Sequence, residues 1–208
     1  MLSQTLLDDL WDFSDPSGSE SRFRDGIARA DDAADAAELK TQLARALGLQ
    51  DRFAEAEAVL DDVAAVTGGT HIVGVRIALE RGRVRNSSGH PESAAPLFTD
   101  AASAAAACGA VFLHVDALHM LAIVEPDRAA HWTAEALRVL DADEDPRTQR
   151  WRVSLHNNAG WMLFDAGDLE GARREFLVAR EDAIRWGTTQ QVEWADEALA
   201  ECDAALGT

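Results

Sequence analysis

Arginine is the residue type in this 208-residue chain that is best suited to recognition chemistry. Four arginines lie between Arg76 and Arg85, and three more lie between Arg147 and Arg152. A guanidinium group can pair with a carboxylate through two parallel hydrogen bonds, so such groups could bind an acidic peptide. Acidic residues crowd other stretches, namely 31–38, 51–62 and 141–145. Charge runs on helices are typical of solvated faces, which is how we interpret the acidic stretches.

Residues that could support catalysis or metal binding are sparse. His114 and His119 are five positions apart and therefore point to different sides of a helix, and the other histidines have no carboxylate at metal-ligand spacing. The chain lacks a Gly-rich phosphate loop, a Gly-x-Ser-x-Gly elbow and a His-Glu-x-x-His stretch. Cys108 and Cys202 are the two cysteines, which indicates neither a disulfide framework nor a zinc site. We therefore predict no enzyme activity, no cofactor and no metal.

A repeated spacing organises the chain and is clearest from Asn157 to Ala179. A small residue marks an origin, larger or apolar residues follow at positions 3 and 9, a small one follows at 12, a larger one at 16, and a small or apolar one at 19. The best copy is Gly160, Leu163, Leu169, Ala172, Phe176 and Ala179. Further copies begin at Ala44, Gly82 and Ala117, and a degenerate one begins at Leu7. A repeat of this period predicts an array of similar structural units.

Proline positions support the repeat. Pro16, Pro91 and Pro126 each fall nine residues after an origin, where proline can occupy the first turn of a helix without losing a hydrogen bond. The residues expected to stand just before these second helices are Asp15, His90, Glu125 and Asp168. Turn-forming residues at 14–19, 67–70, 86–89, 141–146 and 186–189 separate segments of helical period.

The spacing resembles the tetratricopeptide repeat (TPR) family, closely at 157–183 and well at 40–63. The resemblance implies an all-α, right-handed superhelical solenoid of antiparallel helix pairs. We expect one TPR-like domain over 1–208, with repeats at approximately 1–34, 35–68, 71–109, 110–141 and 147–186. Segment 188–206 is expected to be a C-terminal capping helix, because its apolar stripe lies opposite Glu193, Glu197 and Glu201. The residues of that stripe are Val192, Ala195, Leu199, Cys202, Ala205 and Leu206.

Composition narrows the class of protein. The formal net charge of −18 argues against nucleic acid as the main ligand, because phosphate binding needs a basic surface. The first thirteen residues lack the pattern of a signal peptide, and the weakly polar run from Ala101 to Leu113 is too short to span a bilayer. Lys40 is the sole lysine among nineteen basic residues, a bias typical of a GC-rich bacterial genome. We expect a cytoplasmic bacterial protein that binds neither nucleic acid nor membrane.

The resemblance also implies where a partner would bind. In the TPR family the first helix of each pair lines a concave groove, and the groove-facing offsets select a set of candidate residues in this chain. These candidates are Arg45, Arg76, Arg83, Asn86, His114, Asn157 and Trp161. Such a groove could hold a peptide with acidic residues, with Trp161 as an apolar anchor. The alternative is that the arginines pair with acids on adjacent helices and that Trp161 packs under the last helix near Trp194.

Three functions remain open from the sequence. The leading one is a protein or peptide interaction module that acts as an adaptor. The alternatives are a peptide-sensing regulator of a bacterial signalling system and a self-assembling structural subunit, and a homodimer is possible. These functions are implied by the architecture alone, so the sequence does not identify the partner.

Overall fold

The computed structural model describes residues 2–67 and 71–207, and every regular element in them is a helix. No strand occurs in these two ranges. The predicted all-α class is therefore confirmed. No helix in the described part of the chain is long and apolar enough to cross a membrane.

The helices form two compact units, Met1–Val124 and Glu125–Thr208. The first contains α1 (Gln4–Leu10), α2 (Pro16–Arg29), α3 (Ala33–Gly48), α4 (Phe53–Thr67), α5 (His71–Ser87), α6 (Pro91–Ala107) and α7 (Val111–Val124). The second contains the 3-10 turn η1 (Pro126–Arg128), α8 (Ala129–Leu140), α9 (Pro146–Gln149), α10 (Trp151–Asp165), α11 (Leu169–Trp186) and α12 (Thr189–Leu206). The single domain expected over 1–208 stays a prediction.

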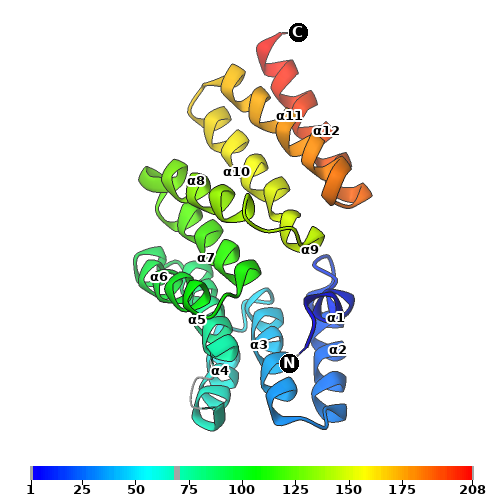
Figure 1. Ribbon diagram of the computed structural model, residues 1–208, viewed down its shortest axis with the longest axis vertical. Helices are drawn as coiled ribbons and strands as arrows, with labels where there is room; N and C mark the ends of the chain where they lie inside the picture. The colour runs from blue at the N-terminus through cyan, green and yellow to red at the C-terminus, as the bar shows by residue number, and fades with distance from the viewer. Residues whose placement is uncertain (1, 68–70, 208) are drawn as a thin grey trace. The chain divides into compact units, whose positions relative to one another are not determined.

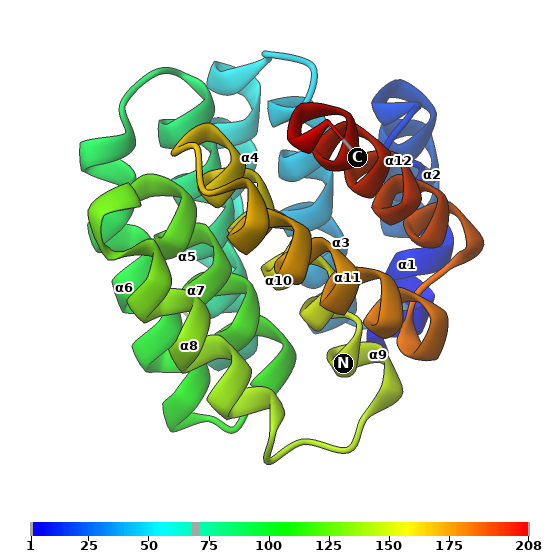
Figure 2. The same ribbon diagram turned by 90° about the horizontal axis from the view of Figure 1, so that it is seen from above.

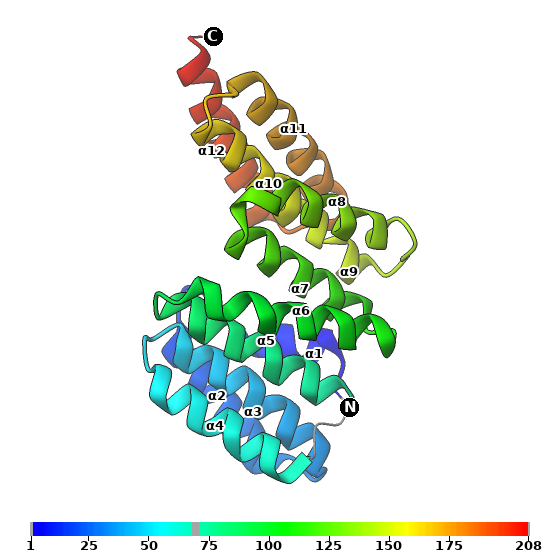
Figure 3. The ribbon, with the colours of Figure 1, turned by 90° about the vertical axis from the view of Figure 1, so that its left-hand side faces the viewer.

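Within each unit, helices pack on their neighbours in chain order. In the first unit α3 contacts α2, α4 and α5, while α6 contacts α5 and α7 (Figures 1 and 2). In the second unit α10 contacts α8 and α11, and α12 packs on α11 (Figure 3). Sequential packing of this kind makes contacts between elements that are close in sequence, as a repeated helix pair requires.

Helix starts follow the expected signals. Pro16 and Pro91 open α2 and α6, and the Asp15 and Asp168 carboxylates accept hydrogen bonds from the first-turn amides of α2 and α11. Pro126 opens the 3-10 turn η1 instead, and α8 begins three residues later. The break predicted at 14–19 is wrong in its second half, because the Asp15 cap allows α2 to begin at Pro16. Residues 68–70 of the predicted break at 67–70 lie outside the described residues.

The small and large residues of the repeat meet in the core. A Cβ atom added at Gly82 would lie 2.4 Å from Cε1 of Phe98, and one at Gly160 would lie 2.4 Å from Cε1 of Phe176. Both phenylalanines are fully buried. The origin must therefore be small because the ring sixteen residues later occupies the space beside it.

The last helix covers α11 through the predicted stripe in part. Ala195 and Cys202 are buried, and Glu193, Glu197 and Glu201 are exposed. The Thr188 hydroxyl and the Gln191 side chain form a reciprocal capping box at its start. The prediction is wrong at Ala205, which is exposed, whereas Leu206 of the same stripe packs against the core.

Candidate functional site

The helices α3, α5 and α7 bring charged side chains together within the first unit. We call this set the charged network, and its members are Glu38, Arg45, Arg76, Glu80, Arg83 and Asp116. Glu38 and Arg45 are seven residues apart on α3, and Arg76 and Arg83 are seven apart on α5. A spacing of seven is two helical turns, so each pair lies on one face of its helix. The helices themselves form because α3 buries Leu39, Leu43 and Leu47 on another face.

Arg76 and Glu38 form a buried ion pair between α5 and α3. The Nε of Arg76 lies 3.0 Å from Oε1 of Glu38, and their side chains are only 8% and 2% exposed. A second Arg76 nitrogen donates to Oε1 of Gln4 at 3.0 Å. Removing one partner of such a pair leaves an uncompensated charge away from water, which makes the pair structurally important.

Arg83 joins α5 to α7. Its guanidinium lies 2.5 Å from Oε1 of Glu80 and also donates to Oδ1 of Asp116. Burial opposes the charge, but the charges of Asp116 and Glu80 prevail and raise the pKa of Arg83. Burial likewise opposes ionisation of Asp116, yet Arg83 and Arg45 lower the pKa of its carboxyl group below the usual value. The two side chains are therefore held as an ion pair.

Arg45 is placed differently from the other two arginines. Its guanidinium carbon lies 5.6 Å from the ring centroid of Trp11 and 5.2 Å from that of Phe13. Both distances are in the range of cation–π interactions. Burial and the neighbouring charge of Arg83 lower the pKa of Arg45, with the carboxylates of Glu80 and Asp116 acting in the opposite direction. Aromatic rings thus contact this cation directly.

The structure brings three of the seven predicted candidates into one network. These are Arg45, Arg76 and Arg83. The contacts of Arg76 and Arg83 are those expected from the alternative interpretation, in which arginines pair with acids on adjacent helices. Arg76 and Arg83 are therefore poorly available to an external carboxylate. Arg45, in contrast, contacts the rings of Trp11 and Phe13.

The other candidates lie elsewhere. The half-buried Asn86 is near the end of α5, where its carbonyl accepts from the Gly89 amide, and the half-buried His114 lies in the first turn of α7. Asn157 and Trp161 are half-buried on α10 in the second unit. The set predicted as one groove is therefore divided between the two units.

Trp161 belongs to the core between α10 and α11. Its ring makes edge contacts with Phe164 at 5.4 Å and with Phe176 at 5.0 Å between centroids. Packing of this residue under a following helix was the alternative expectation. Trp161 does pack against a core cluster that includes Ala198 and Cys202 of the last helix, α12, while Trp194 on the same helix is 57% exposed.

The sequence pattern did not reveal the part played by the first residues of the chain. Trp11 and Phe13 stack face to face at 4.7 Å, and the Trp11 indole nitrogen donates to Oε1 of Gln42 at 3.0 Å. The amide of Leu2 donates to the second oxygen of Glu38 at 3.0 Å. Two aromatic residues two positions apart beside a short helix are the signal that could have identified this segment.

A histidine lies between two carboxylates in the second unit. Nδ1 of His156 is 2.7 Å from Oε2 of Glu175, and Nε2 is 3.9 Å from Oδ2 of Asp182. Burial raises the pKa of the Asp182 carboxyl group, against the lowering effect of His156 and Arg152. In the described part of the chain, no three histidine, cysteine or acidic side chains are arranged to hold a metal ion.

Comparison with known proteins identifies the fold but not the family. No family model matches the sequence, and no curated protein matches it. The chain is similar to BtubC (BKLC) from P. vanneervenii, whose crystal structure superposes with a TM-score of 0.69. The superposition covers 97% of this chain and 84% of that chain at 16% sequence identity. A similarity at this level of identity concerns the arrangement of helices and carries no function with it.

Proposed function

We propose that this protein is a TPR-like interaction module that binds a protein or peptide partner on the face formed by α3, α5 and α7. The recurring contact between a small residue and a ring, Gly82 with Phe98 and Gly160 with Phe176, supports the repeat architecture. A right-handed solenoid of such pairs, a cytoplasmic location in a bacterium and the absence of enzyme activity are parts of the same proposal.

The observation that carries the proposal is the burial of the charged network. Glu38, Arg76, Glu80 and Asp116 are each less than 10% exposed, at positions where apolar side chains could pack the same helices. Replacing a buried ion pair by apolar residues is commonly neutral or stabilising, so stability alone does not account for these charges. Charged groups on the alternate helices α3, α5 and α7 suit recognition of a partner, because they reject partners that lack matching groups.

Arg45 is the member of the network that we assign to the partner. It is contacted by rings instead of by a carboxylate at ion-pair distance among the described residues. Glu80 is a second group that a partner could bind. Its Oε2 is buried and accepts no hydrogen bond from the part of the chain that the structure describes. A partner with aromatic and acidic side chains would satisfy Arg45, and a donor on the partner would satisfy Glu80.

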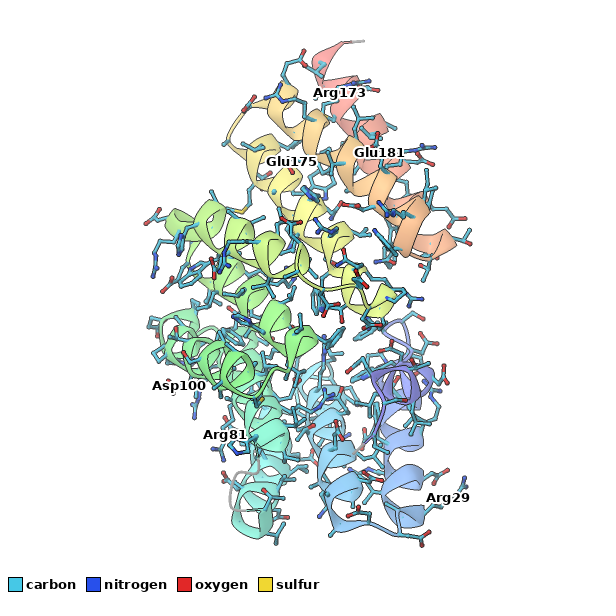
Figure 4. All side chains as sticks on the ribbon, viewed as in Figure 1. Arg29, Arg81, Asp100, Arg173, Glu175 and Glu181 are labelled. Atoms are coloured by element: carbon cyan, nitrogen blue, oxygen red, sulfur yellow. The ribbon has the colours of Figure 1, made fainter. Side chains whose placement is uncertain are left out.

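A pull-down from the native host with wild-type and Arg45→Gln protein tests this function. Glutamine removes the cation and keeps a polar side chain of similar reach, so folding should persist while capture of the partner falls about ten-fold. Arg29→Gln is the matched control, because Arg29 lies on α2 with a side chain that is 81% exposed and extends away from the helices (Figure 4). Equal capture by both variants would exclude this face.

Self-association is the second candidate, supported by apolar side chains left exposed on the last two helices. Ile184 on α11 is 61% exposed and Trp194 on α12 is 57% exposed. Exposed apolar side chains mark an interaction surface where they form a contiguous patch, which a second copy of the chain could cover. Sedimentation of the wild type and of an Ile184→Ser, Trp194→Ser variant would reveal a dimer that the double substitution dissociates; two monomeric species would remove this candidate.

A further inference from the structure

The segment Leu2–Phe13 lies on the charged network instead of beside it. Its polar contacts reach two helices: the Leu2 amide and the Gln4 side chain meet Glu38 and Arg76, and Trp11 meets Gln42. Gln42 lies on α3, and Arg76, which Gln4 contacts, lies on α5. One short stretch of chain thus crosses the side of α3 that carries the network.

Arg45 is the centre of this contact. The cation faces both Trp11 and Phe13, which are stacked with an angle of 2° between their planes. The guanidinium carbon lies within about 6 Å of both ring centroids, and a cation–π interaction strengthens as water is excluded. The pair of rings is therefore the feature by which the segment contacts Arg45, while Leu2, Leu7 and Leu10 attach it to the apolar core.

The segment is attached to the rest of the unit unevenly. Leu7 is fully buried and Trp11 packs on Phe23, whereas Phe13 is 60% exposed and Leu6 is 45% exposed. Its end is tied to α2 by hydrogen bonds between Asp12 and Ser19. The helix within it, α1, has only seven residues, which is too short to be stable without docking contacts.

We propose that residues 2–13 are an internal ligand of the charged network, and that the partner binds by replacing them. The proposal rests on the function proposed above and adds the chemistry of the partner. That partner is a peptide with two aromatic side chains two positions apart, which take the places of Trp11 and Phe13 on Arg45. A neighbouring amide or carboxylate of the peptide replaces Gln4 beside Arg76.

An internal ligand weakens the apparent affinity for the partner. A tethered segment has an effective concentration of the order of millimolar, so an external peptide of equal intrinsic affinity competes poorly. The partner must therefore bind more tightly than the segment, or the segment must first be released. This gives the module a built-in threshold against weak ligands.

Cutting the chain in place tests whether the segment can exchange. A protease site inserted between Ser14 and Asp15 leaves the Asp15 cap of α2 intact after it and the Asp12–Ser14 turn intact before it. The probe is a fluorescent synthetic peptide with the sequence of residues 1–14, followed by anisotropy. We expect the cut chain to keep its helical circular dichroism and melting transition and to bind the probe, with the uncut chain binding at least about ten-fold more weakly.

Three results would overturn the proposal. If the cut chain loses its melting transition once the segment is dialysed away, the segment is an ordinary part of the core. If the cut chain stays folded and does not bind the probe, the segment is not a ligand. Equal binding of the probe to cut and uncut chains would also contradict it, because the site would then not be occupied by residues 2–13.

Substitutions test the chemistry of the contact. In the cut chain, Arg45→Gln should weaken the probe about ten-fold, as should a probe in which both the tryptophan and the phenylalanine are replaced by alanine. Arg29→Gln should leave binding unchanged, because that side chain is exposed and pairs only loosely with Asp25 at 3.8 Å. A probe that binds equally well without its rings would refute the aromatic recognition.

The two proposals fail in different ways. Suppose that the probe exchanges, but the cut chain captures no protein from the native host better than the uncut chain does. The internal ligand then stands and the adaptor function is removed. Capture of a partner by both the cut and uncut chains, with no exchange of the probe, would keep the adaptor function and place its binding surface elsewhere.

Discussion

The two units use the same helix-pairing contact but differ in the helix that precedes it. In the first unit, Gly82 on α5 packs against Phe98 on α6, and α5 also carries Arg76 and Arg83 in buried ion pairs. In the second unit, α10 joins Gly160 to Phe176 and carries Trp161 in an aromatic cluster. The small residue and the ring therefore determine how two helices pack, while the rest of the first helix is free to become either a polar face or an apolar core.

The largest expected effect comes from removing α12, the last helix of the second unit. Truncation after Gly187 removes α12 and exposes Ala172 and Phe176, which pack against Ala198 and Cys202. We expect loss of the cooperative melting transition of the second unit and aggregation, because an uncovered helix pair presents its core to water. Hydrogen exchange should show the first unit still protected. A truncated protein with unchanged solubility and melting would show that α12 is dispensable.

Reversing the charge of Arg83 should destabilise the first unit. Arg83→Glu would place a third carboxylate beside Glu80 and Asp116, so we expect a loss of about 3 to 5 kcal/mol in the free energy of unfolding. This effect is on folding, which makes Arg83 a poor probe of binding. Arg138→Glu is the control, because Arg138 is 69% exposed and, among the described residues, forms its ion pair with Glu135 on its own helix. Equal urea denaturation of the two variants would contradict the importance of the network.

The shared contact should respond alike in both units. Gly82→Ala and Gly160→Ala each add a Cβ that meets a phenylalanine ring at 2.4 Å, so overpacking should destabilise each protein by about 1 to 3 kcal/mol despite the better helix propensity of alanine. Gly48→Ala is the control, since its nearest atom is 3.7 Å away on Val84. If thermal melting showed that the Gly82 or the Gly160 variant is stabilised, the contact would not play the same part in both units.

Acid should affect the units in opposite directions. Burial, with Arg83 and Arg45 nearby, lowers the pKa of His119 to about 4, so the folded state disfavours its proton. Stability from His119 is complete above the unfolded pKa and is lost as pH falls from about 6.5 toward 4. The loss should be about 1 to 2 kcal/mol, because the side chain is partly exposed.

In the second unit, burial raises the pKa of Asp182, so protonation in acid favours the folded state there. Hydrogen exchange at pH 7 and pH 5 should therefore show weaker protection in the first unit and no matching loss in the second. A His119→Gln variant should flatten the response of the first unit. A uniform loss of protection in both units would contradict this difference.

The sequence by itself determined the helices and their pairing residues. Proline and aspartate mark helix starts locally, and the small-to-large spacing follows one helix and the next, so both are readable from neighbouring residues. The resemblance to the TPR family also implied that Arg45, Arg76 and Arg83 lie on first helices, and the structure places them on α3 and α5. Their partners were not readable from the sequence, since Glu38 and Arg76 are 38 residues apart and Arg83 and Asp116 are 33 apart.

Only the tertiary structure decided what occupies the charged face. The same arginines could have faced a partner or each other's helices, and the choice depends on how closely α3, α5 and α7 approach. The placement of Leu2–Phe13 across α3 depends on the same approach, because Gln4 can meet Arg76 only when the first and fifth helices come within one side chain's reach. Contacts between residues 72 positions apart arise from the packing of whole helices, which no local spacing encodes.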